Sequence, residues 1–488
     1  MAPKPSQPYA SVPQNESGSR ESEEFELQSI NSLDFEIPQE SHIEEDVVNE
    51  DTQPKSNMRM AFMNMANSIL GAGIIGQPYA FKETGVVGGI VVLILLTWLI
   101  DWTLRLIVIN ASLAHTRSYQ DTVMYCFGKY GRGLLLFAIS SFAYGGCMAF
   151  CVIIGDTIPH VLKAFIPHSI THSAALSWLF HRNTITVLFT TCISYPLSLN
   201  RDISKLAKAS GFALVGMLII VIITVIRGHF VDPSLKAKLT IQEWTLNINV
   251  FQGISVISFA LVCHHNTLFI YQSLERATIA KFSKLTHVAC LVSMVCCFVM
   301  GVSGVLNFGG NTKGNILNNF KSDDNWINIA RFCFGLNMLT TFPLEIFVVR
   351  DVLKDIVLAG HSDVGSTGST AHLELSSKQH FFITTVLVVT SMSVSLFTCN
   401  LGIILELIGS TSASLMAYII PPMCYLKLKW DSIDYKTMNK SEKRSFILQT
   451  VLPTVGCAIF GFLVMVISSY MSIYNSLHDK SNGHCVAD

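Results

Sequence analysis

The sequence predicts an all-α polytopic membrane protein with about 11 transmembrane helices, and three observations lead to this fold class. Half of the 488 residues are hydrophobic and only 14% are charged, whereas soluble domains carry about 25% charged residues. Apolar runs long enough to cross a bilayer, which takes roughly 20 helical residues, recur along the chain. Two of these runs are interrupted at mid-length by glycines or polar residues. We therefore expect an integral membrane protein embedded in a lipid bilayer.

Residues 1–57 differ from the rest of the chain because they contain thirteen acidic residues against Lys4, Arg20 and Lys55. They are also rich in serine, proline and glutamine. Such a segment cannot bury a hydrophobic core, so we expect a disordered acidic tail. It has no apolar stretch of the kind found in secretory signals, and no cleaved signal peptide is expected.

The first predicted span, Met58–Phe81, is apolar but contains Asn64, Asn67, Gly71 and Gly73. A glycine costs about 1 kcal/mol relative to alanine in a helix interior, so this pair favours an unwound turn. In hydrocarbon an unwound turn is tolerated only where it is buried in protein or lines a wet cavity. The segment therefore indicates a binding site at mid-membrane. Close packing of helices through small residues is an alternative that this span alone leaves open.

Ten further spans follow from hydropathy and length. In chain order they are Val86–Ile109, Gly133–Ile154, Asn183–Leu199, Lys205–Ile226, Asn247–Ser273, Phe282–Asn307, Trp326–Val349, Gln379–Phe397, Leu401–Leu426 and Phe446–Ile473. In the second span Asp101 and Arg105 are four residues apart and share a face, so they are expected to pair. The thirteen cysteines lie mostly inside these runs and are interpreted as small hydrophobic residues, not as a disulfide or metal framework.

The basic residues in the connecting loops predict the orientation. If the acidic tail is cytosolic, the loops on its side carry 18 Lys and Arg residues and the loops on the opposite side carry nine. Cytoplasmic loops are enriched in positive charge, so we expect a cytosolic N-terminus. After an odd number of spans the C-terminus is lumenal, and residues 475–488 form a short non-cytosolic tail.

The sixth span, Asn247–Ser273, runs from an apolar stretch into Cys263-His264-His265-Asn266. One interpretation is a metal site, but adjacent helical residues point to different faces and no acidic partner motif follows. A second is an ordinary helix end at the membrane interface. We favour a third, in which the backbone opens near Ser258–Leu261 as it does in the first span.

The two interruptions fall in the first and sixth spans, as an inverted pair of five-helix repeats requires. Because five is an odd number, the second repeat enters the membrane from the opposite side and the two breaks meet at mid-membrane. We therefore expect a 5+5 inverted repeat made of residues 58–230 and 246–427, followed by an extra transmembrane helix at 446–474.

Four stretches of the sequence resemble the amino acid/auxin permease family. Residues 258–275, which begin Ser-Phe-Ala-Leu-Val-Cys-His-His-Asn, are similar to the family's sixth helix, and residues 67–80 to its first. Residues 342–350 and 409–414 are similar to its eighth and tenth helices. The chain looks like the fungal vacuolar amino acid transporters and the animal sodium-coupled neutral amino acid transporters of this family. The resemblance spans roughly residues 58–426 and implies a LeuT-like fold with broken helices 1 and 6.

A zwitterionic amino acid needs partial positive charge for its carboxylate and partial negative charge for its ammonium group. The half-helix beginning near Gly73 offers free N–H groups and a positive dipole end, and the carbonyls of Ser258–Leu261 suit the ammonium group. Tyr144 and Phe259 are expected to influence side-chain preference. The predicted substrate-binding residues are Asn67, Gly71, Ala72, Gly73, Tyr144, Ser258, Phe259, Ala260 and Leu261.

The coupling ion is expected to be H⁺ or Na⁺, and we prefer the proton because the chain resembles vacuolar transporters. Hydroxyl groups in the eighth helix suit sodium, whereas carboxylates inside the membrane suit a proton. The predicted ion-coupling residues are Asn64, Thr340, Thr341, Glu345 and Glu406. No other cofactor and no bound metal is expected.

The predicted function is secondary active transport of neutral amino acids across the vacuolar membrane, by alternating access coupled to a cation gradient. One alternative is an amino acid sensor that signals through its acidic tail, and another is a sodium-coupled symporter of the plasma membrane. An enzyme is not expected, because His264 and His265 have no nucleophile or metal spacing beside them. The expected partner is a small-molecule amino acid; no nucleic acid is expected, and protein partners are not identified.

Overall fold

The computed structural model describes residues 56–167, 177–201, 210–237, 239–359 and 375–478. They belong to the larger of two compact units, Gln53–Asp488. Within these ranges the chain is helical, and the one extended pairing is an isolated bridge between Ser56 and Leu274. The predicted all-α class agrees with this. The predicted tails at 1–57 and 475–488 lie, apart from a few residues, outside the described part of the chain.

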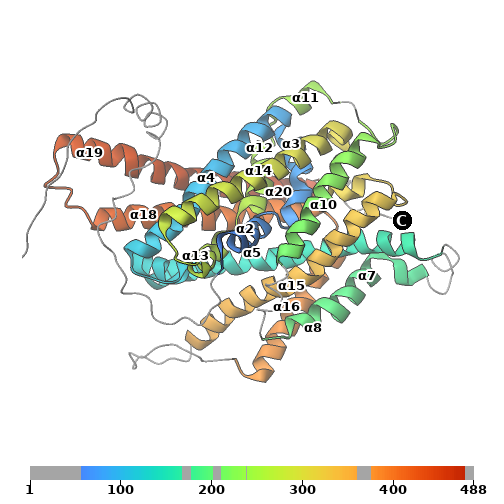
Figure 1. Cartoon of the computed structure of the whole chain (residues 1–488), viewed down its shortest axis with the longest axis horizontal. Helices are drawn as coiled ribbons and strands as arrows, with labels where there is room; N and C mark the ends of the chain where they lie inside the picture. The colour runs from blue at the N-terminus through green and yellow to red at the C-terminus, as the bar shows by residue number, and fades with distance from the viewer. Residues whose placement is uncertain (1–55, 168–176, 202–209, 238, 360–374, 479–488) are drawn as a thin grey trace, which may run out of the picture. The chain divides into compact units, whose positions relative to one another are not determined.

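Eight helices in the described ranges are long and apolar enough to cross a membrane, so the protein is a multi-pass membrane protein (Figure 1). Five are single helices: α4 (Val86–Leu113), α5 (Tyr119–Phe165), α14 (Ile279–Phe308), α15 (Asn325–Ala359) and α16 (Ser377–Phe397). Three are interrupted spans: α12 (Val250–Leu261), η4 (His264–Asn266) and α13 (Thr267–Ser273); α17 (Leu401–Ile408), η7 (Gly409–Ala413), η8 (Leu415–Ile419) and α18 (Ile420–Asp431); and α19 (Lys440–Phe446), η9 (Ile447–Val451) and α20 (Leu452–His478).

Shorter or broken helical segments occupy the other three predicted spans. The first span consists of α2 (Met58–Ile69), η1 (Ala72–Gly76) and α3 (Gln77–Thr84), the fourth of α7 (Arg182–Phe189), η3 (Thr190–Ser194) and α8 (Tyr195–Ser198), and the fifth of α10 (Ser210–His229). None of the three is a single long apolar helix over the described residues. The count of 11 spans and the inverted repeat therefore stay predictions.

Local sequence fixes where several helices begin and bend. The Asn57 side chain accepts a hydrogen bond from the Met60 N–H (3.0 Å) at the start of α2, and Ser118 accepts one from Asp121 (3.0 Å) at the start of α5. Each cap satisfies a backbone donor that a helix start leaves free, worth about 0.5–2 kcal/mol. The long α5 bends at Gly128, whose φ of 65° is a conformation that glycine adopts at low cost.

The first and sixth spans run antiparallel and are joined at both ends. At one end the Ser56 N–H donates to the Ser273 carbonyl (2.6 Å), and at the other the Asn247 N–H donates to the Thr84 carbonyl (3.1 Å). We refer to these as the Ser56–Ser273 end and the Thr84–Asn247 end. Between them α2 packs beside α13, and α3 beside α12 (Figure 1). The two interrupted spans therefore lie next to each other along their whole length.

Several charged side chains inside the helix bundle are paired. The predicted pair of Asp101 and Arg105 is confirmed at 3.2 Å, and His287 Nδ1 lies 2.9 Å from the same carboxylate. Asp156 of α5 pairs with Arg182 of α7 at 3.0 Å. A charge buried without a partner is strongly destabilising, so these pairs let the bundle carry charge in its interior.

The cysteines behave as small apolar residues, with one exception. Eleven cysteines in the described ranges are free thiols and most of them are buried. Cys399 is disulfide-bonded, so the prediction that excluded disulfides is wrong at this position. It lies in the non-helical link between α16 and α17, outside the apolar runs on which that interpretation rested.

Candidate functional site

The helix of the first span stops at Ile69 and resumes at Ala72. Leu70 closes α2 with a 2.8 Å backbone hydrogen bond, and Gly71 then redirects the chain with a ψ of −146°. η1 continues directly into α3, so this half of the span has a helix start at mid-length. A helix start leaves its first N–H groups, here those of Ala72 and Gly73, without intrahelical acceptors. The predicted unwound turn at the glycines is confirmed.

The second break lies slightly later than predicted. The opening expected near Ser258–Leu261 is wrong, because α12 stays helical through Leu261 and the non-helical residues are Val262 and Cys263. The Ser258 carbonyl still accepts the Val262 N–H at 3.1 Å, since the apolar run continues through this turn. The carbonyls that a helix end leaves free are therefore those of the last turn, which ends at Leu261.

Polar side chains hold the second break in place. His264 Nε2 lies 2.9 Å from Thr103 Oγ1 of α4, and Asn266 donates to the Ser68 hydroxyl of α2 at 2.9 Å. These contacts satisfy polar groups that would otherwise be buried unpaired in the membrane. Neither His264 nor His265 belongs to a group of three or more possible metal ligands in the described part of the chain.

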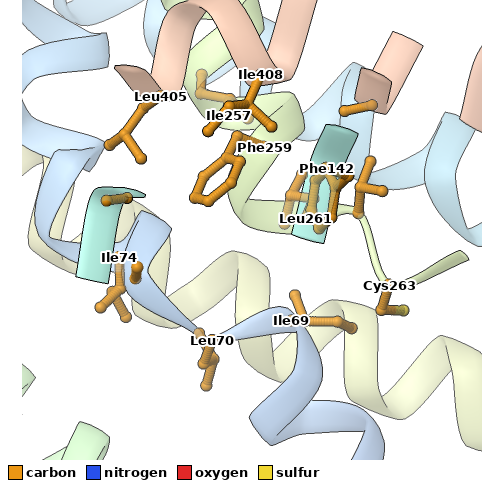
Figure 2. Close-up of a cluster of buried hydrophobic side chains, with 14 of the residues drawn as sticks. Ile69, Leu70, Ile74, Phe142, Ile257, Phe259, Leu261, Cys263, Leu405 and Ile408 are labelled. Carbon is orange, nitrogen blue, oxygen red and sulfur yellow. The ribbon is translucent and has the colours of Figure 1, made fainter. Parts of the chain in front are cut away.

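The two breaks face each other. A Cβ atom on Gly73 would collide with the backbone and Cβ of Ala260, so only glycine lets η1 approach α12 this closely. A Cβ atom on Gly71, by contrast, would meet nothing within 4 Å. Figure 2 shows the side chains around the junction: Ile69, Leu70 and Ile74 come from the first span, and Phe259, Leu261 and Cys263 from the second. One glycine thus provides contact between the spans and the other faces open space.

A cavity of about 240 Å³ opens beside the two breaks. Its wall comes from α2, η1, α5, α12, the η4–α13 segment and α15. The α5 contribution is Phe142, Gly146 and Phe150, spaced four residues apart and therefore on one helix face. Because the wall reaches Asn64 of α2 and Ile270 of α13, the cavity extends from the breaks toward the Ser56–Ser273 end.

Nine of the fourteen predicted site residues line this cavity. They are Asn64, Asn67, Gly71, Ala72, Gly73, Phe259, Ala260, Thr341 and Glu345. Sequence reasoning did not assign Ser68, His265 or Asn266 to the site, although they also line it. The polar residues that interrupt each apolar span could have identified them. We used those polar residues to locate the breaks and did not assign the neighbouring residues to the site.

The other five predicted residues lie outside the cavity wall. Tyr144 is two residues from both Phe142 and Gly146, which is roughly 200° around the helix from the lining face. Ser258 is hydrogen-bonded to the Tyr418 hydroxyl (2.8 Å) and points toward η8. Thr340 donates to carbonyls of its own helix. The remaining two are Leu261 and Glu406.

Two polar atoms of the cavity wall are buried and lack a hydrogen-bond partner: Oε2 of Glu345 and Nδ1 of His265. The wall contains no lysine or arginine. Glu345 faces α5 at Gly146, where a Cβ would lie 3.9 Å from the Glu345 Cγ. The small residue on α5 therefore leaves room for a carboxylate that nothing in the cavity neutralises.

The second intramembrane carboxylate, Glu406 of α17, is surrounded differently. It accepts hydrogen bonds from the Tyr79 hydroxyl (2.8 Å), the Gln252 amide (3.1 Å) and the Ser472 hydroxyl (2.5 Å). These donors come from α3, α12 and α20, so one buried side chain joins four helices toward the Thr84–Asn247 end. We call these four residues the Glu406 cluster.

The fold and the site together define a class of protein. Two antiparallel membrane spans, each broken at mid-length beside a shared cavity, are typical of secondary transporters. The comparison with known families agrees with this class. The chain belongs to the transmembrane amino acid transporter protein family, whose model matches residues 54–474.

Named relatives extend this result. The chain is 47% identical to "Vacuolar amino acid transporter 2" of Saccharomyces cerevisiae over 460 residues, which cover 94% of this chain and 92% of the relative. It is 34% identical over 441 residues to "Putative sodium-coupled neutral amino acid transporter 11" of Bos taurus, with 88% and 89% covered. It is 27% identical over 402 residues to "Sodium-coupled neutral amino acid transporter 7" of Xenopus laevis, with 81% and 86% covered. These relatives are transporters and not enzymes.

Proposed function

We propose that this chain is a secondary active transporter that carries neutral amino acids across the vacuolar membrane by alternating access. The observation that carries the proposal is the contact between the two breaks, at Gly73 and Ala260, beside a cavity of about 240 Å³. Irregular backbone at membrane depth persists where it lines a cavity, and it supplies peptide groups for binding. The similarity to a vacuolar amino acid transporter over 94% of the chain supports both the substrate class and the membrane.

The proposed binding mode uses backbone groups for the part that all amino acids share. The carboxylate binds at the start of η1, near Gly71 and Gly73, where N–H groups are free and the helix dipole is positive. The ammonium group binds the carbonyls in the last turn of α12, near Phe259 and Leu261. Each such interaction is worth about 0.3–1 kcal/mol when exposed and up to about 2 kcal/mol when partly buried.

The aromatic residues beside the breaks surround the substrate side chain. The rings of Phe142 and Phe259 contact each other in a tilted arrangement, with 5.4 Å between their centroids, and the centroid of the His265 ring lies 5.5 Å from that of Phe142. With no lysine or arginine in the wall, the cavity offers no partner for an acidic side chain. The aromatic part of the wall suits the apolar side chains of neutral substrates.

In the proposed orientation the N-terminus is cytosolic and the Ser56–Ser273 end faces the cytosol. The cavity then opens toward the cytosol in this conformation, since it extends from the breaks to that end. The disulfide at Cys399 supports the orientation, because the proposed topology has the α16–α17 link on the opposite side, in the lumen. Disulfides persist in oxidising compartments and are rare in the cytosol.

Proton coupling is the proposed driving force, with sodium as the second candidate. The pair of hydroxyls expected to bind sodium is divided, because Thr341 lines the cavity and Thr340 does not. The Thr341 hydroxyl donates to the Asn337 carbonyl of its own helix (2.8 Å). A carboxylate in the cavity wall, Glu345, supports the proton.

The test is uptake of radiolabelled neutral amino acids into vesicles that contain the purified full chain, under imposed proton or sodium gradients. We expect accumulation to follow the proton gradient and to be lost in Gly71→Val, whose side chain would enter the cavity. The matched control is Gly216→Val on α10, where a Cβ also meets nothing within 4 Å but lies away from the cavity. Full uptake by Gly71→Val would overturn the site, and accumulation that follows only sodium would overturn the coupling ion.

A further inference from the structure

We propose that Glu345 binds the coupling proton inside the substrate cavity and that Glu406 does not carry it. This inference rests on the proposed function, because it assigns one step of that transport cycle to one side chain. The observation behind it is that Glu345 is the carboxylate in the cavity wall, and its Oε2 is buried without a hydrogen-bond partner.

The charge balance of the cavity leads to this assignment. The free N–H groups and carbonyls at the two breaks match the carboxylate and the ammonium group of a zwitterionic substrate. An ionised Glu345 would then add one negative charge that no side chain of the wall neutralises. An uncompensated charge inside the membrane is costly, so the site requires a bound cation whenever it is closed to water.

A proton fits this requirement better than a metal cation does. A proton needs only one carboxylate oxygen, whereas a hard cation needs several oxygen ligands at one point. The titratable groups near Glu345 are few: Cys147 of α5 follows Gly146, which Glu345 faces, and His265 of the η4–α13 segment shares the cavity. No other acidic residue lines the wall, so a second carboxylate for a hard cation is not available there.

The position on α15 also suits coupling. Thr341, Glu345 and Val348 are spaced four and three residues apart and present one face of α15 to the cavity. Glu345 therefore lines the same cavity as the proposed substrate site. In each cycle its carboxylate takes one proton from water on one side of the membrane and returns it to water on the other, and no other bond changes.

Glu406 has the opposite arrangement. It is 1% exposed, lies outside the cavity wall, and both of its oxygens accept hydrogen bonds from Tyr79, Gln252 and Ser472. The three donors satisfy both oxygens of this carboxylate, and its side chain does not line the cavity. Its role is to hold helices together, and proton exchange with the substrate site is left to Glu345.

The test separates exchange of substrate from its coupling to protons. Purified full-length wild type, Glu345→Gln and the matched surface control Glu275→Gln are placed in vesicles; Glu275 is exposed. Two measurements follow: exchange of labelled for unlabelled neutral amino acid without any gradient, and accumulation driven by a proton gradient together with substrate-induced pH change. Glutamine keeps the size and polarity of Glu345 but cannot bind and release a proton.

We expect Glu345→Gln to retain exchange and to lose both proton-driven accumulation and the pH change, while Glu275→Gln keeps all three. Glu345→Asp, which retains the carboxylate, should keep coupled transport and guards against a folding defect in the glutamine variant. Proton-driven accumulation by Glu345→Gln would overturn the inference, and so would loss of exchange in a well-folded variant, because Glu345 would then be a substrate ligand. If the wild type shows no exchange, the proposed function itself fails.

Discussion

The two ends of the broken pair of spans differ in how their polar groups are satisfied. Toward the Thr84–Asn247 end, the Glu406 cluster joins α3, α12, α17 and α20 through three hydrogen bonds to one carboxylate. Toward the Ser56–Ser273 end, the broken spans, α5 and α15 line a cavity in whose wall Glu345 Oε2 and His265 Nδ1 have no hydrogen-bond partner.

This difference indicates which side of the transporter is closed in this conformation. A hydrogen-bonded network of buried groups is rigid and must be broken before its helices separate. Unpartnered polar atoms beside a cavity are instead available to a ligand. Alternating access would exchange the two arrangements, closing the Ser56–Ser273 end and releasing the Glu406 cluster. Five substitutions test this account, from the largest expected effect to the smallest.

The largest effect is expected at the two glycines of the first break. Gly73→Val should abolish transport and also lower the yield of folded protein, because its side chain would collide with Ala260. Gly71→Val should abolish transport and leave folding intact, because its side chain would enter open space. Vesicle uptake and size-exclusion profiles of the same preparations measure the two effects. Equal folding defects in both variants would contradict the assignment of Gly71 to the cavity.

The next effect concerns the closed end. Glu406→Ala should lower the stability of the purified protein, because the buried donors of Gln252 and Ser472 lose this acceptor. Each unsatisfied buried group costs about 1–3 kcal/mol. Thermal unfolding measures the loss, with the exposed Glu275→Ala as its control. An unchanged melting temperature for Glu406→Ala would show that the cluster does not hold the helices together.

In the same unfolding experiment, Glu345→Gln should raise the melting temperature or leave it unchanged. It removes an unpartnered carboxylate and breaks no hydrogen bond at Oε2. Replacing an unpaired buried charge by a neutral group of similar volume is neutral or stabilising. If Glu345→Gln lowered the melting temperature as much as Glu406→Ala does, the proposed difference between the partnered Glu406 and the unpartnered Glu345 would be contradicted.

The smallest effect is expected in a surface loop. Lys321 donates to the Asp232 carboxylate at 2.6 Å and lowers the pKa of Asp232 from 3.8 to about 2. The contribution of this pair to stability is complete above the usual Asp pKa and is lost as the pH falls toward about 2. Because both side chains are exposed to solvent, Lys321→Ala should leave the melting temperature at neutral pH unchanged. A clear drop at neutral pH would mean that the loop contributes more to folding than a solvated pair does.

The sequence was most informative where a local rule applies. Glycines and a polar tetrad inside apolar runs predicted both breaks, because an interrupted span has few stable arrangements in a membrane. The second break was misplaced by a few residues, since helix ends depend on contacts such as His264 with Thr103. This contact joins α4 to the η4–α13 segment across 161 residues of sequence, so it cannot be predicted from a local sequence pattern.

The membership of the cavity was only partly predictable for the same reason. Residues on the breaks themselves, such as Gly71 and Ala260, were found because the break defines them. Tyr144 was misjudged because its helix face depends on how α5 packs, and Phe142 and Gly146 line the cavity instead. Glu345 and Glu406 both occur as single carboxylates in apolar segments, so the sequence alone does not distinguish their roles. The tertiary contacts do, because Glu345 Oε2 has no hydrogen-bond partner and Glu406 accepts a hydrogen bond from Gln252.

The most direct test of the central claim is an experimental structure of the full chain with a neutral amino acid bound. The account predicts the carboxylate of the ligand within hydrogen-bond distance of the N–H groups at Gly71–Gly73. It predicts the ammonium group at the carbonyls of Phe259–Leu261. A ligand bound elsewhere, or first and sixth spans that are continuous helices, would contradict it.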